Sequence, residues 1–231
     1  MIYFNGIDMQ SVAPVKIVDV VVSPIEKNVI ARPRAIQAGS TFVRGRDGTR
    51  TVTITFAVLT QNRDERQIQF LALNEWARSD APGTLRLPNH TGRHLSALCT
   101  SFPEPSLREW WEDRLRFVFT CFDPYWRSDY EKNVACGTAL TALGDVPPLM
   151  RITRTLESDA SSQTYTNGTQ TMAFSTIPTG NMVINLNEQT AAVNGTSIMQ
   201  YYSFASQWIQ PKVGTQTITG TGTVYWRERW A

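Results

Sequence analysis

The feature that most constrains the fold is a regular alternation of apolar and polar residues between Thr51 and Thr60. The apolar side of this segment is formed by Val52, Ile54, Phe56 and Val58, and threonines occupy most of the other side. Successive side chains of a β-strand point to opposite faces, so a period of two predicts a strand with one buried face. Any fold of this chain must therefore lay a sheet over an apolar layer.

A helix is predicted directly after this strand, over residues 63–78. Asn62 suits the N-cap position, and Glu65 follows it at the spacing of a capping box. A mostly apolar stripe is formed by Ile68, Leu71, Ala72, Glu75 and Trp76. We expect this stripe to pack on the sheet, and Ala81-Pro82-Gly83 to stop the helix.

Further short strands are predicted along the whole chain. In the first half they cover residues 84–87, 95–102 and 114–121, and in the second half residues 182–186 and 224–230. Asn167-Gly168 and Asn194-Gly195 are turn signals between strands of the second half. Many short strands separated by such turns are typical of a β-sandwich.

The periodic pattern fades between residues 129 and 148, and Pro147-Pro148 closes this stretch. A domain boundary is expected where the pattern of buried positions stops. We therefore predict a mainly β protein with two β-sandwich domains joined by a linker at 129–148. The N-terminal domain, 1–128, holds the single packed helix and a hairpin arm, and the C-terminal domain covers 149–231.

Composition excludes several function classes. A net charge of +2 gives no strong attraction to nucleic acid or acidic membranes. Three widely spaced cysteines, Cys99, Cys121 and Cys136, indicate reduced, small apolar side chains rather than a disulfide framework. The first residues lack the basic head and apolar run of a secretory signal, and no stretch reaches the roughly 20 apolar residues of a membrane span.

The segment 38–50 stands out because it combines glycines and arginines with two apolar residues, Phe42 and Val43. One interpretation is a mobile surface loop. The other is a hairpin arm that lies against a neighbouring subunit, since exposed apolar residues are costly for a monomer. In the second interpretation Phe42, Val43 and Arg44 are candidates for a subunit interface.

No residue set predicts catalysis or a metal site. His90 and His94 have the spacing of a helical zinc pair, but Pro88 and Gly92 favour a polar loop. Four acidic residues surround Trp110-Trp111, as in some glycosidases, namely Glu104, Glu109, Glu112 and Asp113. Their alternation with arginines favours ion pairs instead, so we expect no enzyme activity, no metal and no cofactor.

The block Asp123-Pro124-Tyr125-Trp126-Arg127-Ser128, which follows an aromatic strand, resembles the end of the N-terminal domain in the distal tail protein (Dit) family of siphophages. Phe4-Asn5-Gly6 resembles the start of that family. The order of arm, capped helix, Pro147-Pro148-Leu149 and the final Trp226–Trp230 is similar as well, so the resemblance covers nearly the whole chain. Residues 210–215 depart from it, because the family's Pro-Gly-Asn turn is altered there.

The resemblance implies a structural virion protein that forms a hexameric ring at the phage tail tip, assembled in the host cytoplasm. The ring would join the tail tube to the adhesion apparatus and leave an axial channel through which DNA passes without specific binding. Implied partners are further copies of the chain, the tail tube protein, the tape measure protein, a tail-associated hub or lysin protein and receptor-binding proteins. It also implies a galectin-like C-terminal sandwich.

Two roles remain open for the DPYW residues. Asp123 and Pro124 are expected to end the preceding strand. Tyr125 and Trp126 either bury surface where two domains or two subunits meet, or cap the core of their own domain.

The alternative function is a carbohydrate-binding adhesion module of a phage tail. Such a module needs aromatic rings displayed together on one face, for instance Tyr201, Tyr202 and Trp208. The second domain contains no histidine, so a galectin-type donor set is incomplete there, and we expect the fold without that site.

Overall fold

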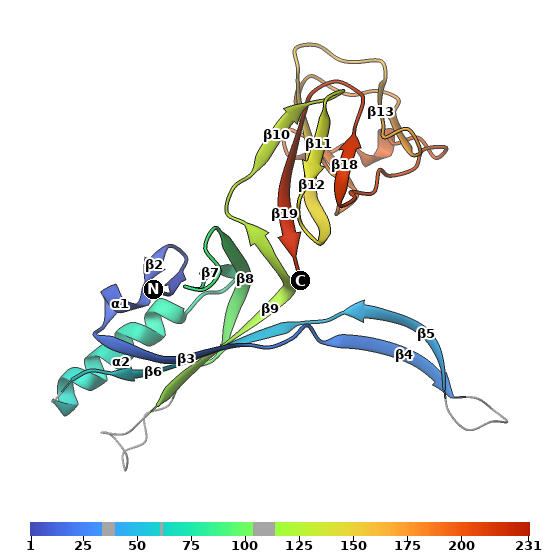
Figure 1. Cartoon of the computed structure of the whole chain (residues 1–231). Helices are drawn as coiled ribbons and strands as arrows, with labels where there is room; N and C mark the ends of the chain where they lie inside the picture. The colour runs from blue at the N-terminus through green and yellow to red at the C-terminus, as the bar shows by residue number, and fades with distance from the viewer. Residues whose placement is uncertain (34–39, 61, 104–113) are drawn as a thin grey trace. The chain divides into compact units, whose positions relative to one another are not determined.

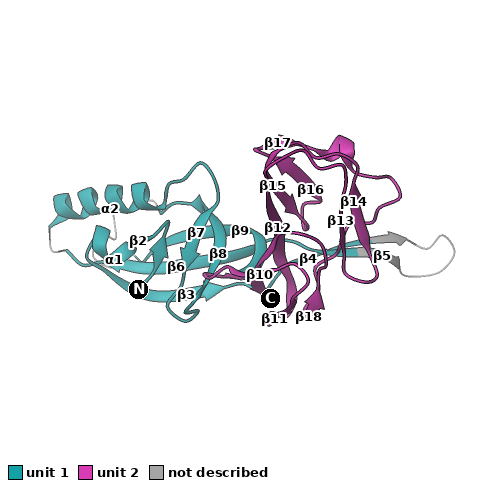
Figure 2. Ribbon diagram, turned by 90° about the horizontal axis from the view of Figure 1, so that it is seen from above, with its two compact units in different colours: residues 1–126 teal, residues 127–231 magenta. Residues whose placement is uncertain are grey.

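The computed structural model divides the chain into two compact units, Met1–Trp126 and Arg127–Ala231 (Figure 2). It describes residues 1–33, 40–60, 62–103 and 114–231, and of residues 31–33 and 40–44 the backbone alone. Strands predominate in both units, which confirms the predicted mainly β fold. The division falls after Trp126, two residues before the predicted end of the first domain.

The first unit is built on a sheet with the strand order β3-β6-β9-β8-β7-β1-β2. These strands are β1 Tyr3–Phe4, β2 Ile7–Asp8, β3 Val15–Val22, β6 Arg50–Val58, β7 Gly83–Arg86, β8 Arg93–Ser101 and β9 Leu115–Ser128. Two further strands, β4 Lys27–Pro33 and β5 Ser40–Asp47, form a separate hairpin. The helices are the short α1, Met9–Val12, and the long α2, Arg63–Ala77, which runs along the sheet (Figure 2).

The core of the first unit follows the predicted alternation. Val52, Ile54 and Phe56 of β6 are fully buried, as are Phe117 and Phe119 of β9. The rings of Phe56 and Phe117 stack with their centroids 5.1 Å apart. Strand β6 pairs antiparallel with β3 on one side and with β9 on the other, so both of its edges are hydrogen-bonded.

Helix α2 begins where it was predicted, but it buries a different face. The Asn62 side chain accepts a hydrogen bond from the Asp64 amide at 3.0 Å, which confirms the N-cap. The buried residues are Phe70, Leu73, Trp76 and Ala77. Of the predicted stripe only Trp76 is among them, and the prediction is wrong for Ile68 and Leu71, which are 68% and 60% exposed. The Trp76 indole sets the helix rotation, since it packs against Phe4, Phe117 and Phe119 and donates to the Ile7 carbonyl.

Strand β9 continues through the DPYW block, so the prediction that Asp123 and Pro124 end it is wrong. The buried positions shift by one residue, from Cys121 to Pro124, and then alternate again to Ser128. Pairing with β6 stops at Cys121, which lies opposite Arg50. Pro124 therefore removes no hydrogen bond from that ladder, and a proline is tolerated inside the strand.

The second unit has the sheet order β17-β16-β15-β12-β19, with β10 also paired to β19. Its strands are β10 Lys132–Ala135, β12 Val146–Leu156, β15 Gly180–Asn185, β16 Thr190–Val193, β17 Thr196–Ser197 and β19 Thr223–Trp230. The smaller pairs are β11 Ala139–Ala142 with β18 Gly214–Thr217, and β13 Gln163–Thr166 with β14 Thr171–Phe174, and Met199–Tyr201 form a short 3-10 helix. Buried residues from these sheets, among them Leu140, Tyr165 and Ile184, form one core together with Ile218, which follows β18.

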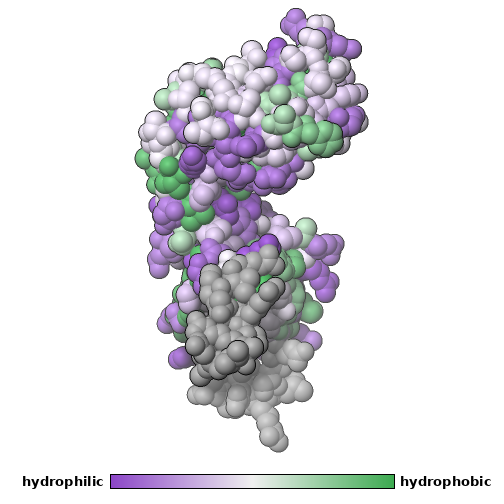
Figure 3. All heavy atoms as spheres, turned by 90° about the vertical axis from the view of Figure 1, so that its right-hand side faces the viewer, coloured by the Kyte–Doolittle hydropathy of each residue, from purple (hydrophilic) through white to green (hydrophobic). Residues whose placement is uncertain are grey.

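The predicted linker at 129–148 is not a linker in the structure. It contains β10 and β11, which pair with β19 and β18, and the start of β12. These strands are short and alternate weakly, so the sequence gives no signal for them. On the face that Figure 3 shows, the surface of this unit is mostly pale and purple, that is, neutral to hydrophilic, with smaller green areas.

Both predicted Asn-Gly turns connect adjacent strands, β13 to β14 and β16 to β17. Asn194 has a φ of 49° and Gly195 a φ of 80°, the backbone that this dipeptide favours. The Asn194 side chain also accepts a hydrogen bond from the Asn181 amide at 2.9 Å. A Cβ atom at Gly180 would lie 2.3 Å from the same side chain, so this close approach requires glycine.

If the two units have independent cores, one substitution should destabilise only one of them. Phe117→Ala removes a fully buried ring from the first core, which costs about 3–5 kcal/mol of unfolding free energy. We expect two transitions in calorimetry, of which only one moves in this variant. Ile184→Ala, in the second core, is the matched control and should move the other; a joint shift of both transitions in either variant would contradict the division.

Candidate assembly interface

Strands β4 and β5 form a hairpin that is paired only with itself among the described strands, and we call it the arm. In Figure 1 it extends beyond the ends of β3 and β6. Its register runs from Lys27 opposite Asp47 to Pro33 opposite Ser40. Seven residues of β4 span about 24 Å at roughly 3.4 Å per residue. The predicted hairpin arm is thus confirmed, and it begins earlier than residue 38.

The arm presents apolar side chains to solvent near its base. Val29 is 58% exposed and Ile30 is 46% exposed. The side chains of Phe42, Val43 and Arg44, predicted for an interface, lie outside the described residues. Their backbone belongs to β5, where the register shifts between Ile30 and Ala31, so that Val43 is the extra residue of a bulge.

Backbone hydrogen bonds make the arm a continuation of the β3–β6 pair. The Ser23 amide donates to the Thr51 carbonyl at 2.9 Å, and the Glu26 amide donates to the Thr49 carbonyl at 3.1 Å. The Gly48 amide donates back to Glu26 at 2.8 Å. A Cβ atom at Gly48 would lie 2.7 Å from the Asn28 side chain, so glycine permits this close crossing.

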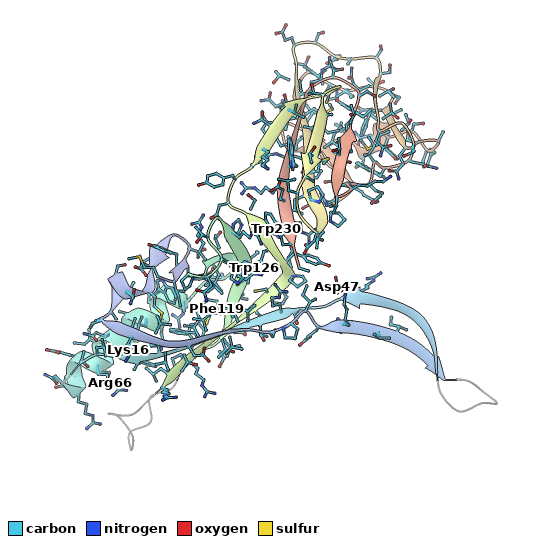
Figure 4. All side chains as sticks on the ribbon, viewed as in Figure 1. Lys16, Asp47, Arg66, Phe119, Trp126 and Trp230 are labelled. Carbon is cyan, nitrogen blue, oxygen red and sulfur yellow. The ribbon has the colours of Figure 1, made fainter. Side chains whose placement is uncertain are left out.

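Asp47 lies at the base of the arm (Figure 4) and ties it to Tyr125 of the DPYW block. Its carboxylate accepts hydrogen bonds from the Lys27 ammonium and from the Tyr125 hydroxyl. These two hydrogen bonds lower the pKa of Asp47 below its usual value. Tyr125, a predicted interface residue, therefore contacts the arm of its own subunit.

Trp126 stacks on the imidazole of His90, with centroids 3.8 Å apart and planes inclined by 21°. Only 3% of Trp126 is exposed, so its ring is already buried in the single chain. Burial, Arg93 and Arg50 lower the pKa of His90. Within the described residues no three His, Cys, Asp or Glu side chains come together as a metal site.

Arg50 is a buried cation where the pairing of β6 with β9 ends, and no sequence motif marks it. It is 7% exposed, and among the described residues its Nε and one terminal nitrogen have no hydrogen-bond partner. Desolvation lowers its pKa. Arg50 lies opposite the buried Cys121, and paired residues of neighbouring strands point to the same face, so the Arg50 side chain points inward. The alternation of β6 gave the only sequence signal, because Arg50 shares the buried face of Val52.

The other chemistry-bearing residues are accounted for within the described chain. Burial raises the pKa of Cys99 to about 11 and that of Cys121 to about 12, so both thiols stay protonated at neutral pH. All three cysteines are free. The acidic residues Glu104, Glu109, Glu112 and Asp113 and the pair Trp110-Trp111 lie outside the described residues.

The aromatic residues considered for a sugar site pack on one another. Tyr202 stacks on Trp208 at 5.0 Å and meets Phe174 edge-on at 5.6 Å. Both residues, with Tyr201, pack against the second core. Among the described helices, none has the length and apolar character to cross a membrane.

Comparisons with known proteins agree with this architecture. Residues 143–230 match the family model for the siphovirus-type tail component, C-terminal domain. Among solved structures, the crystal structure of the SPP1 Dit protein is similar over 100% of this chain and 98% of that chain, with a TM-score of 0.82 at 16% sequence identity. A phage P2 baseplate in its activated conformation with Ca aligns over 94% of this chain and 91% of that chain, with a TM-score of 0.49 at 7% identity. The comparison with curated protein sequences gives no match.

These findings confirm the resemblance to the distal tail protein family. The family model supports it over the second unit, and the likeness to SPP1 Dit supports the fold over the whole chain. That relative is described as a paradigm of the hub adsorption apparatus in phages that infect Gram-positive bacteria.

The lowered pKa of His90 predicts that the first unit becomes less stable in acid. The unfolded chain binds a proton at a pH near 6.5, whereas folded His90 resists protonation, so the unfolding free energy of the first unit should fall as pH drops below about 6.5. His90→Phe keeps a ring over Trp126 without the titrating group and should flatten this part of the pH profile. His94→Phe is the control; an identical slope in wild type and His90→Phe between pH 7 and 5 would refute the prediction.

Proposed function

We propose that this chain is the distal tail, or baseplate hub, subunit of a siphophage, which assembles as a closed hexameric ring at the tail tip. The first units form the ring, and the second units serve as attachment points. The ring joins the tail tube to the adhesion apparatus and leaves an axial opening for DNA. Its role is structural and requires no catalysis or cofactor.

The arm is the observation that carries this proposal. It adds no strand to the sheet of its own unit among the described residues, yet it exposes Val29 and Ile30. Apolar residues displayed on a projecting hairpin indicate a surface that is covered in an assembly. An arm on one subunit and a receiving surface elsewhere on the next make a heterologous contact, which closes into a ring when the rotation permits.

Interface residues follow from this geometry. Phe42, Val43 and Arg44, on β5, are proposed to contact the neighbouring subunit. Tyr125 contributes by holding the base of the arm through Asp47, and Trp126, beside it in the sequence block, by stacking on His90. The contact of Tyr125 with Asp47 would help to set the direction in which the arm leaves its own subunit.

The fold likeness to SPP1 Dit supports the assembly context. That protein is described as a hub, and the family model describes a tail component. By extension, the proposed partners are the tail tube protein, the tape measure protein, a tail-associated hub or lysin protein and receptor-binding proteins. The chain would be assembled in the host cytoplasm and reside in the virion.

Shortening the arm should abolish the ring and leave the subunit folded. Because Lys27 lies opposite Asp47, residues 28–46 can be replaced by Asn-Gly, a two-residue hairpin turn that keeps the Asp47–Tyr125 contact. Without Phe42 and Val43, each interface between neighbouring subunits would lose the burial of two side chains, worth roughly 1.5–3 kcal/mol each. We expect wild type to sediment as a ring and the variant as a monomer, with a nearly unchanged melting temperature of the first unit.

A double substitution provides the matched control for arm length. Val29→Lys with Ile30→Lys retains the hairpin but removes its exposed apolar residues, and should weaken the ring strongly. If the shortened variant still forms the wild-type ring, the arm is only a surface loop. A collapse of its melting temperature would instead assign the arm to the subunit's own fold.

A further inference from the structure

A polar recess lies on the second unit, over strands β12, β15 and β19. It has a volume of about 230 Å³. Arg151 of β12 lies opposite Asn185 of β15 on one side and opposite Tyr225 of β19 on the other. Arg227 of β19 lies opposite Leu149 in the next row. Planar polar side chains thus form a layer across three strands.

Glu131 holds the two central arginines in place. Its carboxylate accepts a hydrogen bond from Arg151 Nη2 at 2.7 Å and lies 3.8 Å from Arg227 Nε. Arg227 Nη1 donates to the carbonyls of Ser128 and Asp129, both at 3.2 Å. The Arg151 guanidinium also lies over the Tyr225 ring, 5.0 Å from its centroid. Both guanidinium groups are therefore oriented before any ligand arrives.

Each of these arginines keeps hydrogen-bonding capacity. The second terminal nitrogen of each, Nη1 of Arg151 and Nη2 of Arg227, has no partner in the described parts of the chain. The two side chains are 43% and 36% exposed, so ligands can reach them. A guanidinium with free N–H groups suits a carboxylate or another planar anion.

The opposite rim of the recess is a fixed turn that supplies acceptors. The Asn187 side chain accepts from the Met150 amide at 2.7 Å and donates to the Pro148 carbonyl at 3.0 Å, which pins the turn to β12. Asn185 donates to Glu188 at 3.4 Å. The carboxylate of Glu188 and the amide oxygen of Asn185 can accept hydrogen bonds from hydroxyl groups.

We propose that this recess binds one acidic saccharide unit, a sugar ring that carries a carboxylate. Three arginines and two glutamates line the recess, so its charge favours a single anion. The arginines would take the carboxylate, and Asn185 with Glu188 the ring hydroxyls. A volume of about 230 Å³ lies below the roughly 300–1,000 Å³ of drug-sized sites, which limits the ligand to about one ring. The proposal concerns the second unit alone and does not depend on ring assembly.

The test uses the full chain and D-glucuronate, with D-glucose as the neutral probe, in saturation-transfer and amide-shift NMR titrations. We expect glucuronate to bind saturably in the millimolar range and to shift amides of β12, β15 and β19, and glucose to bind at least tenfold more weakly. Arg227→Gln should weaken glucuronate binding at least tenfold. Arg229→Gln, two positions along the same strand and outside the recess lining, should leave it unchanged.

A second variant keeps the test decisive if Arg227→Gln disturbs folding. Leu149→Trp fills the recess without changing any charge and should abolish binding while the melting temperature stays near wild type. Equal affinity for glucose and glucuronate would overturn the acidic preference. Absence of saturable glucuronate binding, or an equal loss in Arg229→Gln, would overturn the site.

Discussion

The pairing of β6 on both of its edges is the constraint on which the first unit depends. Because β3 and β9 both bond to it, its register cannot slip without exposing Val52, Ile54 and Phe56 to solvent. The same strand leads directly back into β5. The arm therefore continues from a strand that is bonded on both edges, and the contacts of Asp47 and Gly48 fix its base.

The region where the arm leaves the sheet contains polar and charged side chains that are buried or partly buried. The Arg50 guanidinium, two of whose nitrogens have no partner in the described part of the chain, lies with a partly buried imidazole and an indole where the β6–β9 ladder ends. A buried cation without a carboxylate partner costs folding free energy. The aromatic core, from Phe4 to Phe119, offsets this cost and permits a polar joint to persist beside it.

The sequence predicted those features that depend on local rules. The period of β6, the Asn62 cap and the Asn-Gly turns depend on neighbouring residues alone, and each is present in the structure. The buried face of α2 could not be predicted in the same way, because the packing of Trp76 against distant phenylalanines sets the helix rotation. Pro124 led to the prediction that β9 ends in the DPYW block. A proline interrupts a strand only where a neighbouring strand would accept a hydrogen bond from its amide, and the pairing with β6 has already stopped at Cys121. The layer of Arg151, Asn185 and Tyr225 joins residues from three strands and has no sequence signal.

The bulge at Val43 restricts how the arm can change in length during evolution. Side chains of a strand alternate between faces, so the bulge exchanges the faces of β5 residues on its two sides relative to β4. An insertion that adds one residue to a single strand would repeat this exchange and reverse every side chain toward the tip. Insertions that keep the same side chains on each face of the arm must add two residues to each strand. Related arms should therefore differ in length by multiples of two residues per strand.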